Sequence, residues 1–196
     1  MEFLTGVKEK ETISVSEMLS GDYVGKTEKM NGAVHNIRDM GELAIIILRK
    51  AEGLVQCVYE EGKTEFDLKD LKEESAVEVT GVIALEERAP QGFELRLTGI
   101  RVLSEPAETM PIAINKWKMN TSLETRLSLR PVSLRNVRER AKFKIQEGIV
   151  RGFREFLSSQ GFTEVHTPKI VSRGAEGGAN VFKLNYFNKK AELGQS

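Results

Sequence analysis

The stretch Phe93-Glu94-Leu95-Arg96-Leu97-Thr98-Gly99-Ile100-Arg101-Val102-Leu103 decides the fold, because it has the pattern of one long strand that changes phase midway. Apolar and polar residues alternate as far as Thr98, and the alternation resumes one residue out of step after Gly99. A β-bulge at this glycine would turn both apolar sets towards one core. We therefore predict a single strand here, the last of a set.

Four more strand patterns precede it and complete a known order. They cover Met30 to Arg38, Leu43 to Lys50, Leu54 to Tyr59, and Ala76 to Leu85. A short helix is predicted over Phe66 to Glu74, between the third and fourth strands. Five strands with a helix in this place are the order of an OB-fold barrel, a common platform for oligonucleotides. A small barrel without any nucleic-acid role has the same pattern, so the pattern alone leaves both open.

The rest of the chain changes from strand to helix patterns. Residues 104–131 contain three prolines and no apolar repeat of 3.6 residues, which predicts a linker. A helix is predicted from Ser133, its N-cap, to Gln160, with Gly161 as its C-terminal stop. Its apolar stripe comprises Ile145, Ile149, Phe153, Phe156 and Leu157. A strand is predicted over Phe162 to Val165, ended by Pro168.

Composition narrows the class of protein. The chain of 196 residues is 30% charged and contains no run of about 18 apolar residues, so no transmembrane helix is expected. Its N-terminus lacks the basic and apolar regions of a signal peptide. The single cysteine, Cys57, excludes an internal disulfide and is expected to be a small core residue, and no metal site is predicted. A soluble cytoplasmic protein with no membrane partner fits these features best.

The net charge of zero conceals two regions of opposite charge. Residues 1–105 carry 13 Lys and Arg against 21 Asp and Glu, a net of −8. Residues 116–154 carry 11 Lys and Arg against 3 Glu, a net of +8. A basic centre beside an acidic part suggests a local contact with a polyanion. A solvated helix face would have the same charge, so charge alone leaves both interpretations open.

Five segments in order carry a resemblance to a known family. They are NGAVHNIRD at 31–39, ILR at 47–49 with EGLVQ at 52–56, LETRLSLR at 123–130, GFTEVHTPKI at 161–170, and EGGA at 176–179. Together they resemble the class II aminoacyl-tRNA synthetases of the aspartate, asparagine and lysine group, and most of all archaeal-type aspartyl enzymes. The resemblance runs from about Lys26 to Ser196. It implies an OB-fold anticodon-binding domain at 1–105, a hinge at 106–131, and the start of an α/β catalytic domain with an incomplete antiparallel sheet at 132–196.

The resemblance implies roles for four barrel residues. Gln56 occupies the place of a glutamine that reads the central anticodon base, because a carboxamide both donates and accepts hydrogen bonds. Ile45 stands where the family stacks an aromatic side chain, and stacking is typically worth about 1–3 kcal/mol per base. Arg38 and Glu94 are further candidates for anticodon contacts. Each of these residues is alternatively a plain surface residue of a strand or turn.

The resemblance also implies a partial active site. Glu176 is expected to receive the α-ammonium group of bound aspartate, and Gly177 and Gly178 to let this loop move. A glycine-rich surface turn is the alternative. Pro168 belongs to motif 1, which builds a homodimer interface in this class. Periodicity does not tell whether the apolar stripe of the long helix packs on a partner or on its own domain.

The family uses ATP and Mg²⁺ to activate the amino acid, with arginines of motifs 2 and 3 that this sequence lacks. We therefore expect no catalytic residue in this chain, which alone would bind tRNA-Asp, and tRNA-Asn as a second possible partner, without charging either. ATP and Mg²⁺ are expected to bind it poorly. A portion of an asparaginyl enzyme and a free-standing tRNA-binding OB module are the alternatives. The segment Leu123 to Arg126 favours the aspartyl enzymes.

Overall fold

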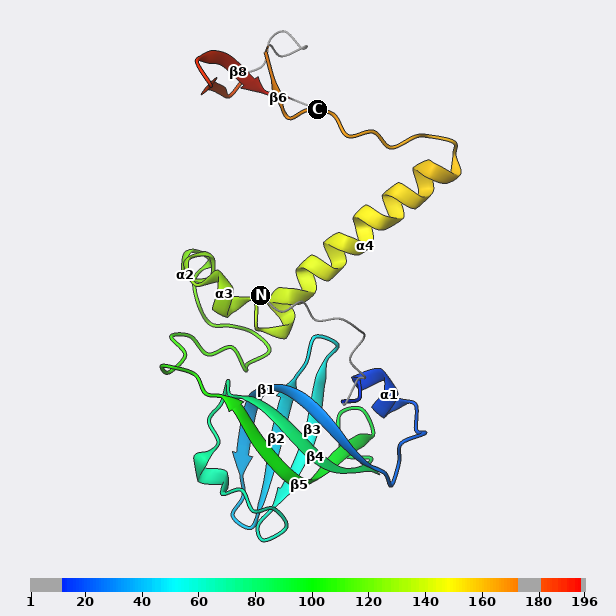
Figure 1. Cartoon of the computed structure of the whole chain (residues 1–196), viewed down its shortest axis with the longest axis vertical. Coiled ribbons are helices and arrows are strands. Elements are labelled where there is room, and N and C mark those ends of the chain that lie inside the picture. The colour runs from blue at the N-terminus through cyan, green and yellow to red at the C-terminus, as the bar shows by residue number, and fades with distance from the viewer. Residues whose placement is uncertain (1–11, 173–180, 195–196) are drawn as a thin grey trace, which may run out of the picture. The chain divides into compact units, whose positions relative to one another are not determined.

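A closed five-stranded barrel forms the first part of the computed structural model, which describes residues 12–172 and 181–194 (Figure 1). Its strands are β1 Thr27–Asp39, β2 Leu43–Arg49, β3 Leu54–Glu60, β4 Ala76–Leu85 and β5 Phe93–Ser104. They follow the order β1-β2-β3-β5-β4, and β1 pairs with β4 to close the barrel. Only the β3–β5 pair among these is parallel. The predicted OB-fold is confirmed.

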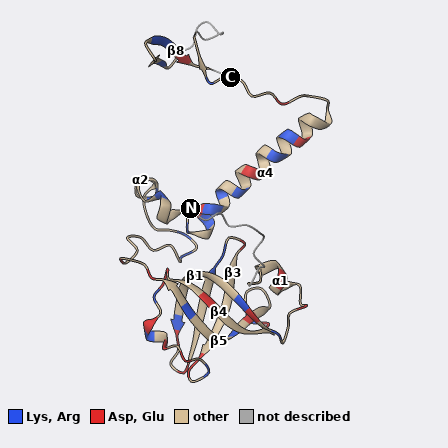
Figure 2. Cartoon of the chain, in the orientation of Figure 1, with Lys and Arg blue, Asp and Glu red and all other residues tan. Residues whose placement is uncertain are grey.

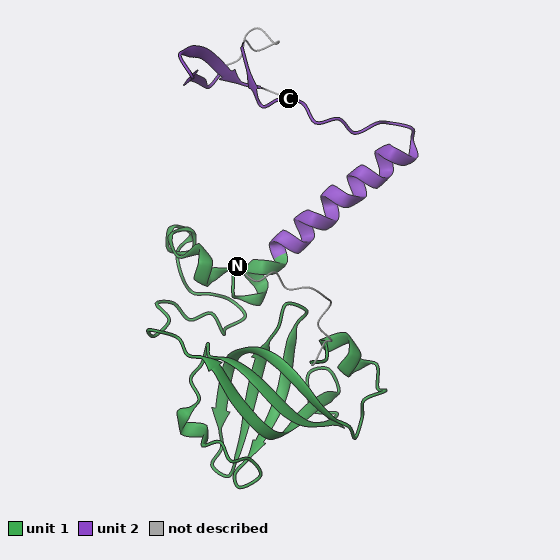
Figure 3. Cartoon of the chain, viewed as in Figure 1, with its two compact units in different colours: residues 1–141 green, residues 142–196 purple. Residues whose placement is uncertain are grey.

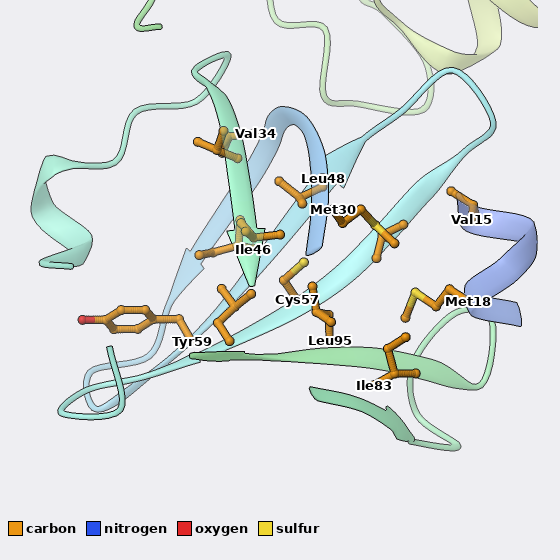
Figure 4. Close-up of a cluster of buried hydrophobic side chains, with 14 of the residues drawn as sticks. Val15, Met18, Met30, Val34, Ile46, Leu48, Cys57, Tyr59, Ile83 and Leu95 are labelled. Atoms are coloured by element: carbon orange, nitrogen blue, oxygen red, sulfur yellow. The ribbon is translucent and has the colours of Figure 1, made fainter. Parts of the chain in front are cut away.

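Alternate residues of the strands fill the barrel, as the strand pattern predicts. In β3 the side chains of Val55, Cys57 and Tyr59 are buried, and those between them face outward. Figure 4 shows Cys57 among Ile46, Leu48 and Leu95, which confirms it as a core residue. Burial raises the pKa of the Cys57 thiol far above its usual range.

The phase change in β5 is a bulge, one residue from the predicted place. Thr80 of β4 pairs with Gly99, whereas Gly81 pairs with Leu97, so Thr98 is the extra residue. Leu97 is buried before the bulge, and Ile100 packs against the same core after it. Both apolar sets therefore reach one core, as predicted.

Two short helices flank the barrel. Helix α1, Val15–Leu19, buries Val15 and Met18 against the barrel core (Figure 4). The sequence analysis missed it, although Ser14 and Glu17 form the capping box that signals such a start. The helix predicted over Phe66 to Glu74 is wrong in length, because only the 3₁₀ turn η1, Leu68–Asp70, forms there. Leu71 directly after it is extended and buried.

Two short helices that the sequence analysis did not predict lie in the predicted linker or overlap its end. They are α2, Leu123–Ser128, and α3, Arg130–Ser133. The Ser122 side chain caps α2 by accepting a hydrogen bond from the Thr125 backbone N–H at 3.1 Å. An N-cap serine of this kind marks the start of a helix even where no apolar repeat is present.

The long helix α4, Val137–Ser159, begins later than predicted. Its N-cap is Asn136, whose Oδ1 accepts from the backbone N–H groups of Arg138 (3.0 Å) and Glu139 (3.1 Å). Ser133 is instead a buried residue of α3. Gly161, with φ +83°, ends α4 as predicted, and the Phe162 N–H reaches back to the Leu157 carbonyl in a Schellman motif.

Beyond α4, residues 162–168 form no strand, so the strand predicted over Phe162 to Val165 is wrong. A three-stranded sheet of order β6-β8-β7 follows, from Ile170–Val171, Lys189–Leu193 and Lys183–Tyr186. Phe187 and Asn188 have positive φ and make the tight turn between β7 and β8. The chain divides into two compact units, residues 1–141 and 142–196 (Figure 3). Among the described residues no helix is both long and apolar enough to cross a membrane.

Candidate nucleic-acid interface

Strand register gathers the predicted barrel residues on one outward face of the sheet. Arg38 of β1 pairs with Ile45 of β2, and Ile45 pairs in turn with Val58 of β3. In the neighbouring row, Ile47 pairs with Gln56. Directly paired residues lie on the same face of a sheet, so these side chains are neighbours.

The row continues onto β5, where Val58 pairs with Arg96. We call the face made by Arg38, Ile45, Gln56, Val58 and Arg96 the outer patch. A cavity of about 240 Å³ opens beside it, lined by Val58, Arg96 and their neighbours. The outer patch thus combines an aliphatic centre with two arginines and one carboxamide.

Glu94 lies on the same outward face, two residues before Arg96 in β5, and uses both carboxylate oxygens. Its Oε2 accepts a hydrogen bond from Gln56 Nε2 at 3.3 Å, and its Oε1 accepts one from Arg96 Nε at 3.0 Å. The Glu94 side chain is only 7% exposed, whereas that of Arg96 is 60% exposed. Because a carboxylate only accepts, it determines which end of the Gln56 amide faces it. The Nε2 end is turned to Glu94, and Oε1 stays available as an acceptor.

Ile45 is half-buried on the outer patch and lies between Arg38 of β1 and Val58 of β3. It offers a flat apolar contact without an aromatic ring. Arg38 is exposed near the end of β1. The structure therefore brings together Gln56, Ile45 and Arg38, with Glu94 behind them, and their contacts with a base stay predictions.

A second polar cluster, missed by the sequence analysis, joins the barrel to the short segment between α3 and α4 within residues 1–141. Arg49 donates two hydrogen bonds to Glu74, at 2.6 and 2.8 Å, and Arg135 donates a third at 3.0 Å. His35 Nδ1 lies 3.1 Å from Arg49 Nη1. The Glu74 side chain is 3% exposed and that of Arg49 is 8% exposed. We call these four residues the Glu74 cluster.

The surroundings of the Glu74 cluster favour an ionised Glu74 and a neutral His35. Burial opposes ionisation of Glu74, but the hydrogen bonds and charge of Arg49 and Arg135 outweigh it and hold its pKa below the ordinary value. Burial, and then the charge of Arg49, lower the pKa of His35, so it is neutral at pH 7. Glu74 also adopts a positive φ of 68° without being glycine. Its sequence neighbourhood gave no signal for this role, because the partners are far apart in the chain.

The remaining predicted site residues lie in the second unit or outside the described residues. Pro168 is exposed in the extended segment between α4 and β6. Glu176, Gly177 and Gly178 lie outside the described residues. Exposed apolar side chains on α4 are those of Ile145 (64%), Ile149 (68%), Phe153 (65%) and Phe156 (63%).

Within residues 12–172 and 181–194, no group of three or more His, Cys, Asp or Glu side chains is arranged to hold a metal ion.

Comparisons with known proteins agree with both halves of this architecture. Residues 29–103 match the family described as OB-fold nucleic acid binding domain. Residues 122–196 match the tRNA synthetases class II (D, K and N). A nucleic-acid-binding OB barrel followed by the start of a class II catalytic domain defines a class II aminoacyl-tRNA synthetase. The chain belongs to that family and corresponds to its N-terminal part.

The curated relatives with similar sequences are aspartate–tRNA ligases. The chain is 43% identical to the aspartate–tRNA(Asp/Asn) ligase of Deinococcus radiodurans, over 88% of this chain and 38% of the ligase. It is 42% identical to the ligase of the same name from Archaeoglobus fulgidus, over 88% of this chain and 41% of that protein. The chain thus spans about two fifths of the length of these curated relatives.

A solved structure shows the same arrangement. Asparaginyl-tRNA synthetase from Pyrococcus horikoshii, complexed with asparaginyl-adenylate, superposes with a TM-score of 0.82 at 31% identity. The superposition covers 95% of this chain and 43% of that enzyme. The family resemblance predicted from the five sequence segments is confirmed.

Proposed function

We propose that this chain is the N-terminal part of an aspartate–tRNA ligase, whose barrel binds the anticodon of tRNA-Asp and of tRNA-Asn. The family membership and the names of the relatives support this proposal. The observation that carries it is the Gln56 carboxamide, which Glu94 holds in one orientation on the outer patch. A preset acceptor and its adjacent N–H suit the Watson–Crick edge of a single base.

Each residue of the outer patch has a role in this proposal. Gln56 reads the central anticodon base, and Glu94 acts on that base through Gln56. Arg38 and Arg96 supply positive charge for phosphates or for the flanking bases. Ile45 contributes an apolar contact in place of a stacked ring, which predicts weaker anticodon binding than an aromatic residue would give.

A substitution at Gln56 tests the proposal on the protein side. An RNA hairpin with the aspartate anticodon GUC should bind Gln56→Ala about 3- to 10-fold more weakly than the unaltered chain, the value of one net hydrogen bond or slightly more. The matched control is Gln160→Ala, an exposed glutamine outside the barrel, which should bind as before. Equal affinities for Gln56→Ala and the unaltered chain would overturn the reader role.

We infer that catalysis belongs to the full-length protein. In this proposal the chain comprises a barrel (1–105), a hinge (106–131) and the start of a catalytic domain (132–196), and the family resemblance implies that Glu176 receives the aspartate ammonium group while Gly177 and Gly178 let its loop move. ATP and Mg²⁺ use in the full-length enzyme follows from the family. Residues 1–196 alone should give no ATP–pyrophosphate exchange, and exchange above a blank would contradict this inference.

The asparaginyl enzymes are the second candidate, because the superposed Pyrococcus structure is one of them. Charging assays with the full-length protein separate the two. Aspartate attached to tRNA-Asp supports the aspartyl proposal, whereas attachment of asparagine alone supports the asparaginyl one. Aspartate attached also to tRNA-Asn would extend to this protein the dual name that its relatives carry. We place the enzyme in the cytoplasm, with the tRNA it charges.

A further inference from the structure

The hinge displays the only tryptophan of the sequence to solvent. Trp117 is 73% exposed, although large aromatic residues are usually mostly buried. No feature of the outer patch or of the Glu74 cluster uses it. Exposing an apolar ring of this size to water costs free energy.

The backbone on both sides of Trp117 is anchored. Ile114 before it and Met119 after it are buried in a small hydrophobic cluster with Ile112. Asn136, the N-cap of α4, donates through Nδ2 to the carbonyl oxygens of Ile114 (2.9 Å) and Lys116 (2.7 Å). The loop is thus fixed by two buried residues and two hydrogen bonds, and the ring needs little ordering on binding.

Positive charge surrounds the ring. The Arg138 guanidinium carbon lies over the Trp117 ring, 5.9 Å from its centroid, within the range of a cation–π interaction. Lys116 and Lys118 flank the ring in sequence, and both are exposed. Figure 2 shows further Lys and Arg at the start of α4. We call Lys116, Trp117, Lys118 and Arg138 the hinge platform.

This combination distinguishes between two kinds of partner. Tryptophan and arginine are frequent at protein–protein contacts, but lysine is depleted there. Nucleic-acid sites instead combine an aromatic face for a base with lysine and arginine for the phosphates on either side. The lysines directly before and after Trp117 in the sequence therefore favour a nucleic acid.

We propose that the hinge platform is a second RNA contact site, on which an unpaired base stacks against Trp117 while Lys116, Lys118 and Arg138 bind the adjoining phosphates. That the RNA is a tRNA rests on the proposed function. The site is separate from the outer patch, because it is built by the hinge and the first turn of α4. It would therefore add affinity that does not depend on the anticodon.

Intrinsic fluorescence tests the proposal directly, because Trp117 is the only tryptophan. The 196-residue chain is titrated with a tRNA-Asp transcript, and affinity is followed separately with an end-labelled transcript. We expect quenching of the tryptophan emission that saturates along with binding. Binding without any change in emission or in acrylamide quenching would overturn the proposal.

Variants separate stacking from simple burial. Trp117→Ala and Trp117→Leu should bind the transcript about 5- to 100-fold more weakly, and Trp117→Phe should recover most of the loss. All three should melt near the temperature of the unaltered chain, since the ring is exposed. Affinity restored by leucine as well as by phenylalanine would show an apolar contact without stacking and would contradict the proposal.

A transcript with a changed central anticodon base separates this inference from the proposed function. If affinity is insensitive to the base but tryptophan is still quenched, anticodon reading fails and the hinge platform stands. If affinity depends on the base and emission never changes, the hinge platform alone fails.

Discussion

Single side chains in this molecule work mainly through buried neighbours. Glu94 accepts hydrogen bonds from Gln56 and Arg96 on the outward face of the barrel, and Glu74 binds two arginines, Arg49 of the barrel and Arg135 before α4. In both cases a carboxylate that is almost inaccessible determines where exposed or functional groups lie. Substitutions at these acids therefore test structure and function together.

Glu74→Gln should destabilise the first unit by about 3–5 kcal/mol, because it leaves the buried Arg49 without its carboxylate. Urea unfolding followed by far-UV circular dichroism measures the change. Glu73→Gln is the matched control, since Glu73 is exposed and bonds mainly to Asn36 and Asn115. A loss at Glu74 no larger than that at Glu73 would refute the role of the Glu74 cluster.

His35 should make the free energy of unfolding depend on pH, at pH values higher than those at which carboxylates titrate. Its pKa is lowered in the folded state from the ordinary value of 6.5, so the unfolded chain binds a proton first as the pH falls. The contribution of neutral His35 to the free energy of unfolding is complete above about pH 6.5, and it is lost as the pH falls towards the pKa of His35 in the folded state.

The measurement is the free energy of unfolding between pH 7.5 and 5.5, for the unaltered chain and for His35→Gln. Glu74 should add to the loss only below its ordinary value of 4.5, because its pKa is lowered too. The unaltered chain should lose more stability over this range than the variant. If the free energy of unfolding changes with pH in the same way for both proteins, the lowered pKa of His35 is contradicted.

The sequence analysis named Arg38, Ile45 and Gln56 of the outer patch but missed Val58, Arg96 and the contacts of the patch. Alternation places Gln56 outward and Cys57 inward, and that much follows from any strand. The bond from Gln56 to Glu94 instead depends on the parallel pairing of β3 with β5, between residues 38 positions apart. The Glu74 cluster likewise brings together four separate segments, and one sequence contains no signal for that.

Among the elements, the strands were easier to predict than the helices. Strand β4 has the predicted bounds, because its alternation is regular. Errors occurred where capping decides the structure: Ser122 starts α2, which has no apolar repeat, and Asn136 starts α4 ahead of its apolar stripe. The strand predicted at Phe162 to Val165 failed because β propensity without a pairing partner does not form a strand.

The β4–β5 bulge predicts opposite outcomes for two glycines. A Cβ on Gly81 would lie 2.4 Å from the Arg96 carbonyl oxygen, whereas one on Gly99 would lie 3.8 Å from Thr80 Cβ. Gly81→Ala should therefore cost about 1–3 kcal/mol through overpacking. Gly99→Ala should be neutral or slightly stabilising, by up to about 1 kcal/mol.

Thermal unfolding of the two alanine variants checks this prediction. Each variant serves as the control for the other, because both sit in the same paired strands. Equal melting temperatures, or a larger loss at Gly99, would show that the backbone approach at Gly81 is not what requires glycine.

The whole molecule combines a well-filled barrel with a second unit that leaves apolar surface open. Ile145, Ile149, Phe153 and Phe156 are each more than 60% exposed on α4, and Phe182 and Phe187 are 77% and 83% exposed. Apolar surface of this kind marks an interaction site. We propose that a second copy of the chain covers the α4 stripe, with Pro168 at the same interface.

Ile149→Lys should convert a dimer of the full-length protein into a monomer, because a charge in an apolar interface is left without a partner. Analytical ultracentrifugation at micromolar concentration measures the mass. Gln146→Lys, a polar position of the same helix, is the control and should leave the dimer intact. A full-length protein that is monomeric before any substitution would contradict the proposal.

The central claim is that the barrel reads the anticodon of an aspartate tRNA, and the RNA itself tests it most directly. We would measure the affinity of the 196-residue chain for a GUC hairpin and for a GCC hairpin that differs only in the central base. The account predicts about 3- to 10-fold weaker binding to GCC, a difference that Gln56→Ala abolishes. Equal affinity for both hairpins would contradict anticodon reading by this barrel.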